Sequence, residues 1–142
     1  MSRDCHNNMK YSRALSPVAA VTNDTAFVSE ILDTADFAAN ELVLIAGSIA
    51  DADVTFTVLL EEGDASNLSD NAAVADANLL GTESGATFLF SSDNKTAKLG
   101  YKGTKRYIRA TVTPANNSGN IFLAGIWAQG APRNAGLTTQ IV

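Results

Sequence analysis

The sequence is poor in the residues that most often carry chemistry. It contains one cysteine, Cys5, and one histidine, His6. A single cysteine cannot close an internal disulfide, and two adjacent ligands without further Cys or His cannot complete a four-ligand zinc site. A nucleophilic triad would also have to use His6 as its base, near the polar N-terminus. We therefore expect no metal and no cofactor.

Charged residues are also scarce. They make up 18% of the 142 residues, and the formal net charge is −5. Phosphate repels an acidic chain, so binding to nucleic acid is not expected. The longest apolar stretch, residues 42–49, is far too short to span a bilayer, and the polar N-terminus does not read as a signal peptide. We expect no membrane partner and synthesis in the cytoplasm.

Recognisable catalytic motifs are missing as well. The sequence contains no GxSxG elbow, P-loop or dinucleotide-binding glycine pattern. Glu61 and Glu62 are adjacent in a predicted strand and point to opposite faces, while Asp51 and Asp53 lie at a strand entry where solvent is expected. Neither pair fits general acid–base chemistry, and we expect no enzymatic activity.

What the chain does have is apolar residues with a period of two. Hydrophobic residues make up 46% of the sequence. In the segment DVTFTVLLEEG, one face carries Val54, Phe56, Val58 and Leu60, and the other carries Thr55, Thr57 and Glu61. This alternation predicts a half-buried strand with Phe56 and Val58 in the core.

Further strands are predicted along the chain at spacings of roughly ten residues. They cover residues 25–33, 41–50, 86–92, 97–103, 105–115 and 121–130. Asp93-Asn94 and Lys102-Gly103-Thr104 are hairpin turn signals between neighbouring strands. The pattern predicts an all-β fold: an antiparallel β-sandwich or jelly-roll-like barrel of about seven or eight strands.

The domain organisation is simple. Residues 1–18 are predicted to form an extended N-terminal arm, residues 19–131 a single β-sandwich domain, and residues 132–142 a C-terminal tail. Deleting residues 1–16 should then leave the fold intact. Residues 63–85 are rich in Gly, Asp, Asn and Ser, which indicates a long surface excursion, with a helical turn possible in residues 69–81.

Two sets of residues are candidate contacts with a partner. The first is a basic strip, which is either the solvated face of a strand pair or an ionic contact with an acidic surface: Lys102, Lys105, Arg106 and Arg109. The second comes from strands that are apolar on both faces, which either a partner chain or the sandwich itself must cover: Leu42, Leu44, Phe122 and Trp127.

Four segments resemble a family of small structural proteins encoded in the head-gene regions of tailed bacteriophages, including head decoration (capsid cement) proteins. They are LSPVAAVTNDTAFVSEILD, DADVTFTVLLEEGDASNLSDNAAVADANLLGTE, KLGYKGTKRYIRATVTPANNSGN and AGIWAQGAPRNA. The likeness covers residues 15–135, and its most specific part runs from Thr57 to Leu80. The family has no catalytic motif to transfer to this chain.

The resemblance implies a virion protein on the outer surface of the capsid. Its expected partners are the major capsid protein and further copies of itself, as a homotrimer or homodimer. Two alternatives stay open. One is another structural component of the head or tail. The other is a carbohydrate-binding module for host adhesion, in which Trp127, Gln129 and Tyr101 would form the sugar site.

Overall fold

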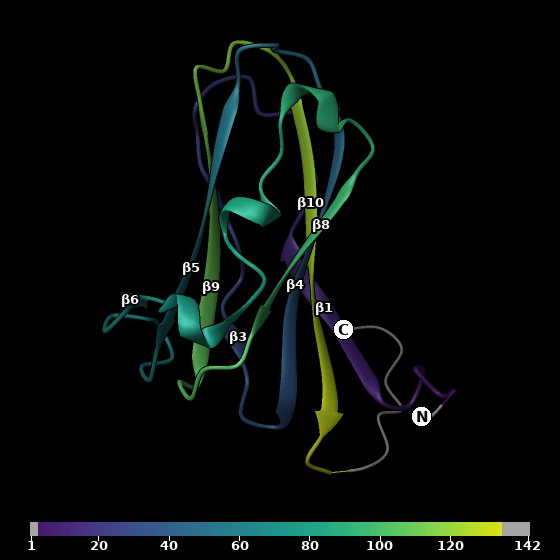
Figure 1. Cartoon of the computed structure of the whole chain (residues 1–142), viewed down its shortest axis with the longest axis vertical. Coiled ribbons are helices and arrows are strands. Elements are labelled where there is room, and N and C mark those ends of the chain that lie inside the picture. Colours follow the sequence, from purple (N-terminus) through teal and green to yellow (C-terminus); the bar gives the residue numbers. More distant parts are fainter. Residues whose placement is uncertain (1–2, 135–142) are drawn as a thin grey trace.

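The structure is a computed structural model that describes residues 3–134 (Figure 1). This part of the chain contains ten strands and three short 3₁₀ turns. Six strands are long: β1 (Met9–Leu15), β4 (Phe37–Ile49), β5 (Thr55–Gly63), β8 (Thr96–Tyr101), β9 (Tyr107–Ala115) and β10 (Ile121–Pro132). The remaining elements are β2 (Phe27–Val28), β3 (Leu32–Asp33), β6 (Ala72–Ala73), η1 (Asp76–Asn78), β7 (Leu79–Leu80), η2 (Ser84–Ala86) and η3 (Phe90–Ser92).

The strands form two antiparallel sheets that face each other as a sandwich, which confirms the predicted fold class (Figure 1). Sheet A has the order β1-β10-β4-β8-β7. Sheet B has the order β2-β9-β5-β6, and β3 also pairs with β9. None of the helical turns within residues 3–134 has the length and hydrophobicity needed to cross a membrane.

Alternation along the strands produces the core between the sheets. Val58 and Leu60 of β5 are buried and Phe56 packs against the core, as the period of two predicts. Ile108, Ala110 and Val112 of β9 face them from the neighbouring strand. Sheet A contributes the inward residues of β4 and β10, among them Leu42, Leu44, Ile121, Leu123 and Trp127.

A bulge in β4 keeps this inward face continuous. Ala46 lies opposite Leu123 and Ile49 lies opposite Ile121, so β4 carries one more residue than β10 over this stretch. The extra residue shifts the alternation by one position. As a result Ile49 is buried together with Ala46, although strict alternation would place Ile49 on the outer face.

Three local predictions were wrong. The first predicted strand, residues 25–33, is two short strands, β2 and β3, separated by Ser29–Ile31. Residues 86–92 form no strand, because η2 and η3 flank an irregular segment there, and Asp93-Asn94 therefore joins η3 to β8 and does not close a hairpin. The turn at Lys102–Gly103 does not close a hairpin, since β8 belongs to sheet A and β9 to sheet B, and the chain crosses between the sheets.

The predicted boundary after residue 18 also needs correction. Met9–Leu15 are not a separate arm but form β1, which pairs with β10 from Met9↔Gly130 to Leu15↔Gly125. Ala14 and Leu15 are buried in the core. The sandwich therefore begins at Met9, and β10 continues to Pro132, one residue past the predicted end of the domain. The predicted tail lies mostly outside the described residues.

The long excursion between β5 and β8 closes one side of the sandwich. The Val74 amide donates to the Leu60 carbonyl, and the Glu83 carboxylate accepts the Leu60 amide at 2.7 Å. The Thr87 hydroxyl donates to the Phe56 carbonyl at 2.9 Å. These contacts give the free edge of β5 hydrogen-bond partners that a neighbouring strand would otherwise supply.

Candidate functional site

The basic strip does not form an isolated positive surface. Lys105 is ion-paired with Asp64, and Arg106 is ion-paired with Asp33 through two parallel hydrogen bonds of 3.1 and 2.9 Å. Lys102 is exposed and has no ion-pair partner within residues 3–134. Three of the four cations of the strip have carboxylate partners, because Arg109 is paired as well.

Arg109 lies on the outer face of sheet B. It is directly opposite Glu61 on β5, and its Nε and Nη2 both donate to Glu61 Oε2, at 3.1 and 2.8 Å. Both side chains are largely shielded from solvent. This cross-strand pair neutralises the middle of the sheet B surface, so Arg109 is not available for an acidic partner without breaking it.

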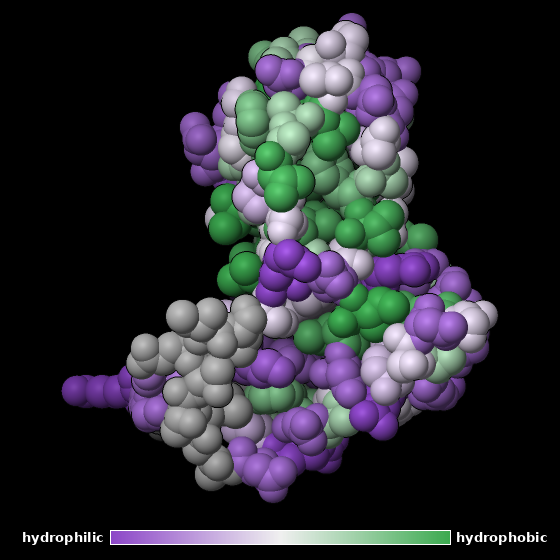
Figure 2. All heavy atoms as spheres, turned by 180° about the vertical axis from the view of Figure 1, so that it is seen from behind, coloured by the Kyte–Doolittle hydropathy of each residue, from purple (hydrophilic) through white to green (hydrophobic). Residues whose placement is uncertain are grey.

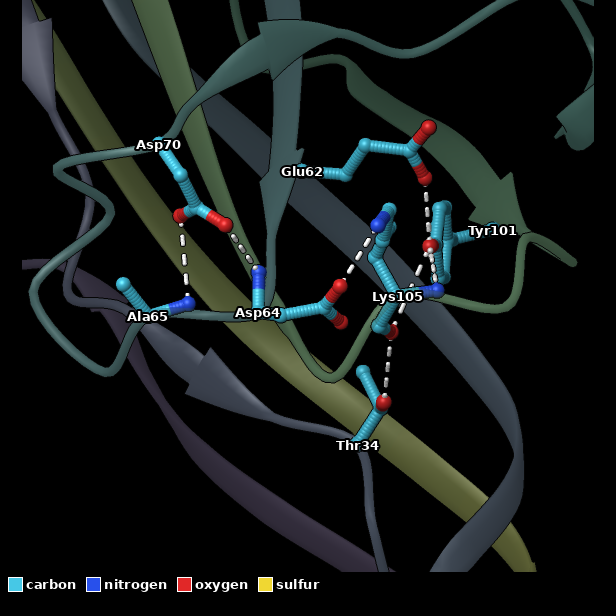
Figure 3. A network of polar contacts seen from close by, with 7 residues as sticks. All are labelled: Thr34, Glu62, Asp64, Ala65, Asp70, Tyr101 and Lys105. Atoms are coloured by element: carbon cyan, nitrogen blue, oxygen red, sulfur yellow. Dashed lines mark hydrogen bonds and ion pairs between the residues drawn. The ribbon is translucent and has the colours of Figure 1, made fainter.

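A polar network ties the crossing between the sheets to the loop after β5 (Figure 3). The Tyr101 hydroxyl donates to Glu62 at 2.6 Å and accepts the Lys105 amide at 3.0 Å. Asp70 accepts the backbone amides of Asp64 and Ala65. The network therefore orders two loops at one end of the sandwich.

The shifts in pKa within this network have structural causes. Burial, reinforced by the hydrogen bond to Glu62, raises the pKa of the Tyr101 phenol. The two backbone amides lower the pKa of Asp70, and the ion pair with Asp64 raises the pKa of Lys105. Each shift favours the protonation state that the hydrogen bonds already require, which is typical of a structural network rather than a reacting site.

Leu42, Leu44 and Trp127 were predicted as possible partner contacts, and the structure corrects this. All three are fully buried between the sheets. The indole Nε1 of Trp127 donates to the Glu30 carbonyl at 3.1 Å. The sandwich closes over these side chains, as the alternative interpretation stated, and Phe122 is the one member of the set that reaches the surface.

The sugar site suggested for the carbohydrate-binding alternative is also not formed. Trp127, Gln129 and Tyr101 are all buried. The amide of Gln129 donates to Asn40 Oδ1 at 2.8 Å and to the Asp33 carbonyl at 3.0 Å, inside the sandwich. None of the three offers an exposed ring or amide to a ligand.

The outer face of sheet A carries a row of apolar residues across its two central strands. The outward residues of the two central strands lie opposite one another, with Val43 beside Ile126 and Ile45 beside Ala124. Phe122 follows on β10, against the backbone of Gly47. We call this set the apolar stripe: Val43, Ile45, Phe122, Ala124 and Ile126.

Polar residues border the apolar stripe on both sides. Lys98 and Thr96 of β8 lie beside Val43 and Ile45, and Arg13 of β1 lies beside Ile126. Seen from behind, the molecule shows several groups of hydrophobic residues around its middle, with hydrophilic residues between them and at both ends (Figure 2). An apolar centre with a polar rim is the usual layout of a protein–protein contact.

Sequence reasoning found this surface only in part. It recognised that the strands containing Val43, Ile45 and Ile126 are apolar on both faces, but it named the inward residues as contacts. Which face of a strand points outward depends on the second sheet, and a single strand carries no information about that. Phe122 is the one residue of the predicted apolar set that lies on the surface, and its contact with a partner stays a prediction.

Comparisons with known proteins do not assign this chain to a family. No protein-family model matches it, and no curated protein matches it significantly. Within residues 3–134, no group of three or more His, Cys, Asp or Glu side chains is arranged to hold a metal ion.

Several solved structures are similar to it at low identity. The SPBc2 prophage-derived protein YomS has 13% identity and a TM-score of 0.48, over 86% of this chain and 94% of that one. The xylan-binding module CBM15 has 11% identity and a TM-score of 0.46, over 92% and 95%. The CBM22-1 xylan-binding domain of Paenibacillus barcinonensis Xyn10C has 7% identity and a TM-score of 0.44, over 88% of this chain and 86% of that one. At these values the similarities carry no argument about function.

Proposed function

We propose that this chain is a non-catalytic virion protein that decorates and stabilises the capsid of a tailed bacteriophage. In this proposal the outer face of sheet A docks onto the major capsid protein. The observation that carries the proposal is the apolar stripe, which is continuous across the two central strands β4 and β10. An apolar sheet face of this kind on a small domain is typical of a contact surface.

The two sheet faces differ in a way that supports this choice. The outer face of sheet B carries four threonines on its paired central strands, Thr55, Thr57, Thr111 and Thr113, together with the Glu61–Arg109 ion pair. Val28 and Leu59 are also exposed on this face, but Thr111 lies between them, and the hydroxyls and the satisfied ion pair around them are compatible with water. On the outer face of sheet A, the exposed Ile45 and Phe122 belong to an uninterrupted apolar row, whose burial against a partner is favourable.

A decoration protein needs a modest contact that a shell repeats many times. Symmetry supplies many equivalent sites, and linked copies gain avidity without any new contact. A rigid sandwich with one apolar face meets this requirement. The resemblance of residues 15–135 to head decoration proteins supports the same function from the sequence.

The proposal is tested by charging one face at a time. Ile45→Lys places an ammonium in the apolar stripe, and Leu59→Lys makes the same change on the outer face of sheet B; these two side chains are 43% and 36% exposed. We expect Ile45→Lys to weaken attachment to capsids lacking the protein by about tenfold or more, because the charge would be desolvated on docking. Leu59→Lys should bind like the wild type.

The opposite pattern of capsid occupancy would contradict the proposed contact through sheet A. Wild-type occupancy for Ile45→Lys, with lost occupancy for Leu59→Lys, would move the contact to sheet B. Electron cryo-microscopy of intact virions would identify which face touches the shell. A density in the tail or connector would instead support the alternative structural role.

A further inference from the structure

The edges of the two sheets are not equally protected. On sheet B, β2 and β3 pair with β9 at one edge, and β6, Glu83 and Thr87 cover β5 at the other. On sheet A, β7 pairs with the end of β8, and η2 packs beside β8. β1 is the outermost strand at the opposite edge of sheet A, with β10 as its single strand partner in the described chain.

One end of β1 is nevertheless occupied. The Glu30 amide donates to the Ala14 carbonyl at 3.0 Å, and the Glu30 carboxylate pairs with Arg13 at 2.8 Å. At the other end, the Met9 amide donates to the Cys5 carbonyl at 3.0 Å. The free part of the edge in the described chain is therefore Lys10–Arg13, with the Met9 carbonyl beside it. An unpaired strand edge is a template for another strand, because its amides and carbonyls are already aligned.

We infer that two copies of this chain associate through antiparallel pairing of β1 with β1 of a second copy, around a twofold axis at Tyr11. A twofold axis makes the contact self-complementary, since each residue meets its partner in the same register. Tyr11 would face Tyr11, Lys10 would face Ser12, and Met9 would face Arg13. No pair of like charges is directly opposite, which such pairing requires.

Other registers are less favourable. Moving the pairing by one residue places Lys10 opposite Arg13, and it also turns the outer face of one sheet toward the core side of the other. Centring the axis on Ser12 instead requires the edge at Ala14, which Glu30 already occupies. The register centred on Tyr11 avoids both problems.

The inferred dimer does not depend on the capsid assignment, but it has a consequence for it. A twofold axis perpendicular to sheet A joins two five-stranded sheets into one and leaves both outer faces on the same side. Tyr11, which is exposed on that face, would lie between two copies of the apolar stripe. The dimer would present two copies of the docking surface on the same side of one continuous, twisted sheet.

Cross-linking tests the register directly. In a Cys5→Ser background, Tyr11→Cys should form a disulfide-linked dimer under mild oxidation, because opposite residues of an antiparallel pair are about 4.5–5.5 Å apart at Cα, within disulfide reach. Thr96→Cys, an exposed residue on β8 of the same sheet, is the matched control and should stay monomeric on a non-reducing gel. Equal cross-linking of both variants would overturn the inference.

The second test uses charge and the full-length chain in analytical ultracentrifugation. Tyr11→Lys places two lysines opposite each other and should raise the dimer dissociation constant by at least about tenfold, whereas Thr96→Lys should not change it. Circular dichroism spectra of both variants should match that of the wild type, which is the control for correct folding. A wild type that is monomeric at all concentrations, or a Tyr11→Lys variant that dimerises normally, would refute the pairing. Ile45→Lys should still dimerise but should bind capsids more weakly. A failure of the inferred dimer can therefore be distinguished from a failure of the proposed capsid contact.

Discussion

At the scale of single residues, neighbours on one strand differ sharply in environment. Leu59 and Leu60 are adjacent on β5, yet Leu60 is fully buried and Leu59 is partly exposed on the outer face of sheet B. The same contrast separates Leu44 from Ile45 on β4. Period-two geometry alone produces these differences.

Truncation of the two leucines should therefore have unequal effects. Leu60→Ala should reduce the free energy of unfolding by about 2–5 kcal/mol, because it removes buried contacts and leaves a cavity. Leu59→Ala should cost less than about 1 kcal/mol, since that side chain is partly in water. Denaturant unfolding of both variants measures the difference, and equal losses would contradict the assigned faces.

The Tyr101 hydroxyl is a second residue whose role can be measured. Tyr101→Phe removes its hydrogen bonds to Glu62 and Lys105 and should lower stability by about 1 kcal/mol. Because the folded-state pKa of Tyr101 is raised, its phenol stabilises the fold below its unfolded pKa. That contribution is lost as the pH rises above about 10. The wild type should lose more stability than Tyr101→Phe between pH 9 and 11 in thermal unfolding.

At the scale of elements, the long strands were predictable and the short ones were not. Alternation located β5 and β9, since each is long enough to repeat its pattern several times, and a continuous apolar run located β10. β2 and β3 have two residues each and carry no period. β1 was overlooked because its sequence, MKYSRAL, lies at an edge, where charged side chains replace apolar ones on one face.

The corrected position of β1 changes the expected effect of N-terminal deletion. Removing residues up to Asn8 should leave stability nearly unchanged, since that segment lies before the sheet. Extending the deletion through Leu15 removes β1, including the buried Ala14 and Leu15, and should cost at least about 3 kcal/mol. Melting temperatures of the two truncated proteins provide the comparison. Similar melting temperatures for the two truncated proteins would contradict the role of β1 and support the predicted N-terminal arm of residues 1–18.

At the scale of the whole molecule, the sequence predicted a sandwich but not how its sheets are connected. A turn such as Lys102–Gly103 has the same composition whether it closes a hairpin or carries the chain to the opposite sheet. The choice is made by long-range contacts, among them the Tyr101–Glu62 hydrogen bond and the Lys105–Asp64 ion pair. For the same reason, the outward face of sheet A emerged only from the complete fold.

Carboxylates in the loops also make global stability depend on pH. Hydrogen bonds and an arginine partner lower the folded-state pKa of Asp33, Asp51 and Asp70. Their contribution is therefore complete above the unfolded pKa of about 4 and is lost as the pH falls through the lower folded values. Thermal unfolding between pH 7 and 2 should show this loss, and Asp33→Asn should show a smaller one. An acid dependence unchanged in Asp33→Asn would contradict the role of its pair with Arg106.

The pairing of Met9 with Gly130 has a practical consequence. Peptides attached ahead of β1 and behind β10 would emerge from the same end of sheet A, where both strands meet in Figure 1. Because Met9 and Gly130 lie opposite each other in the ladder, two different cargoes attached at these ends would be held side by side on a single rigid body. On a decorated particle, this would give a dense array of paired antigens or enzymes with defined orientation.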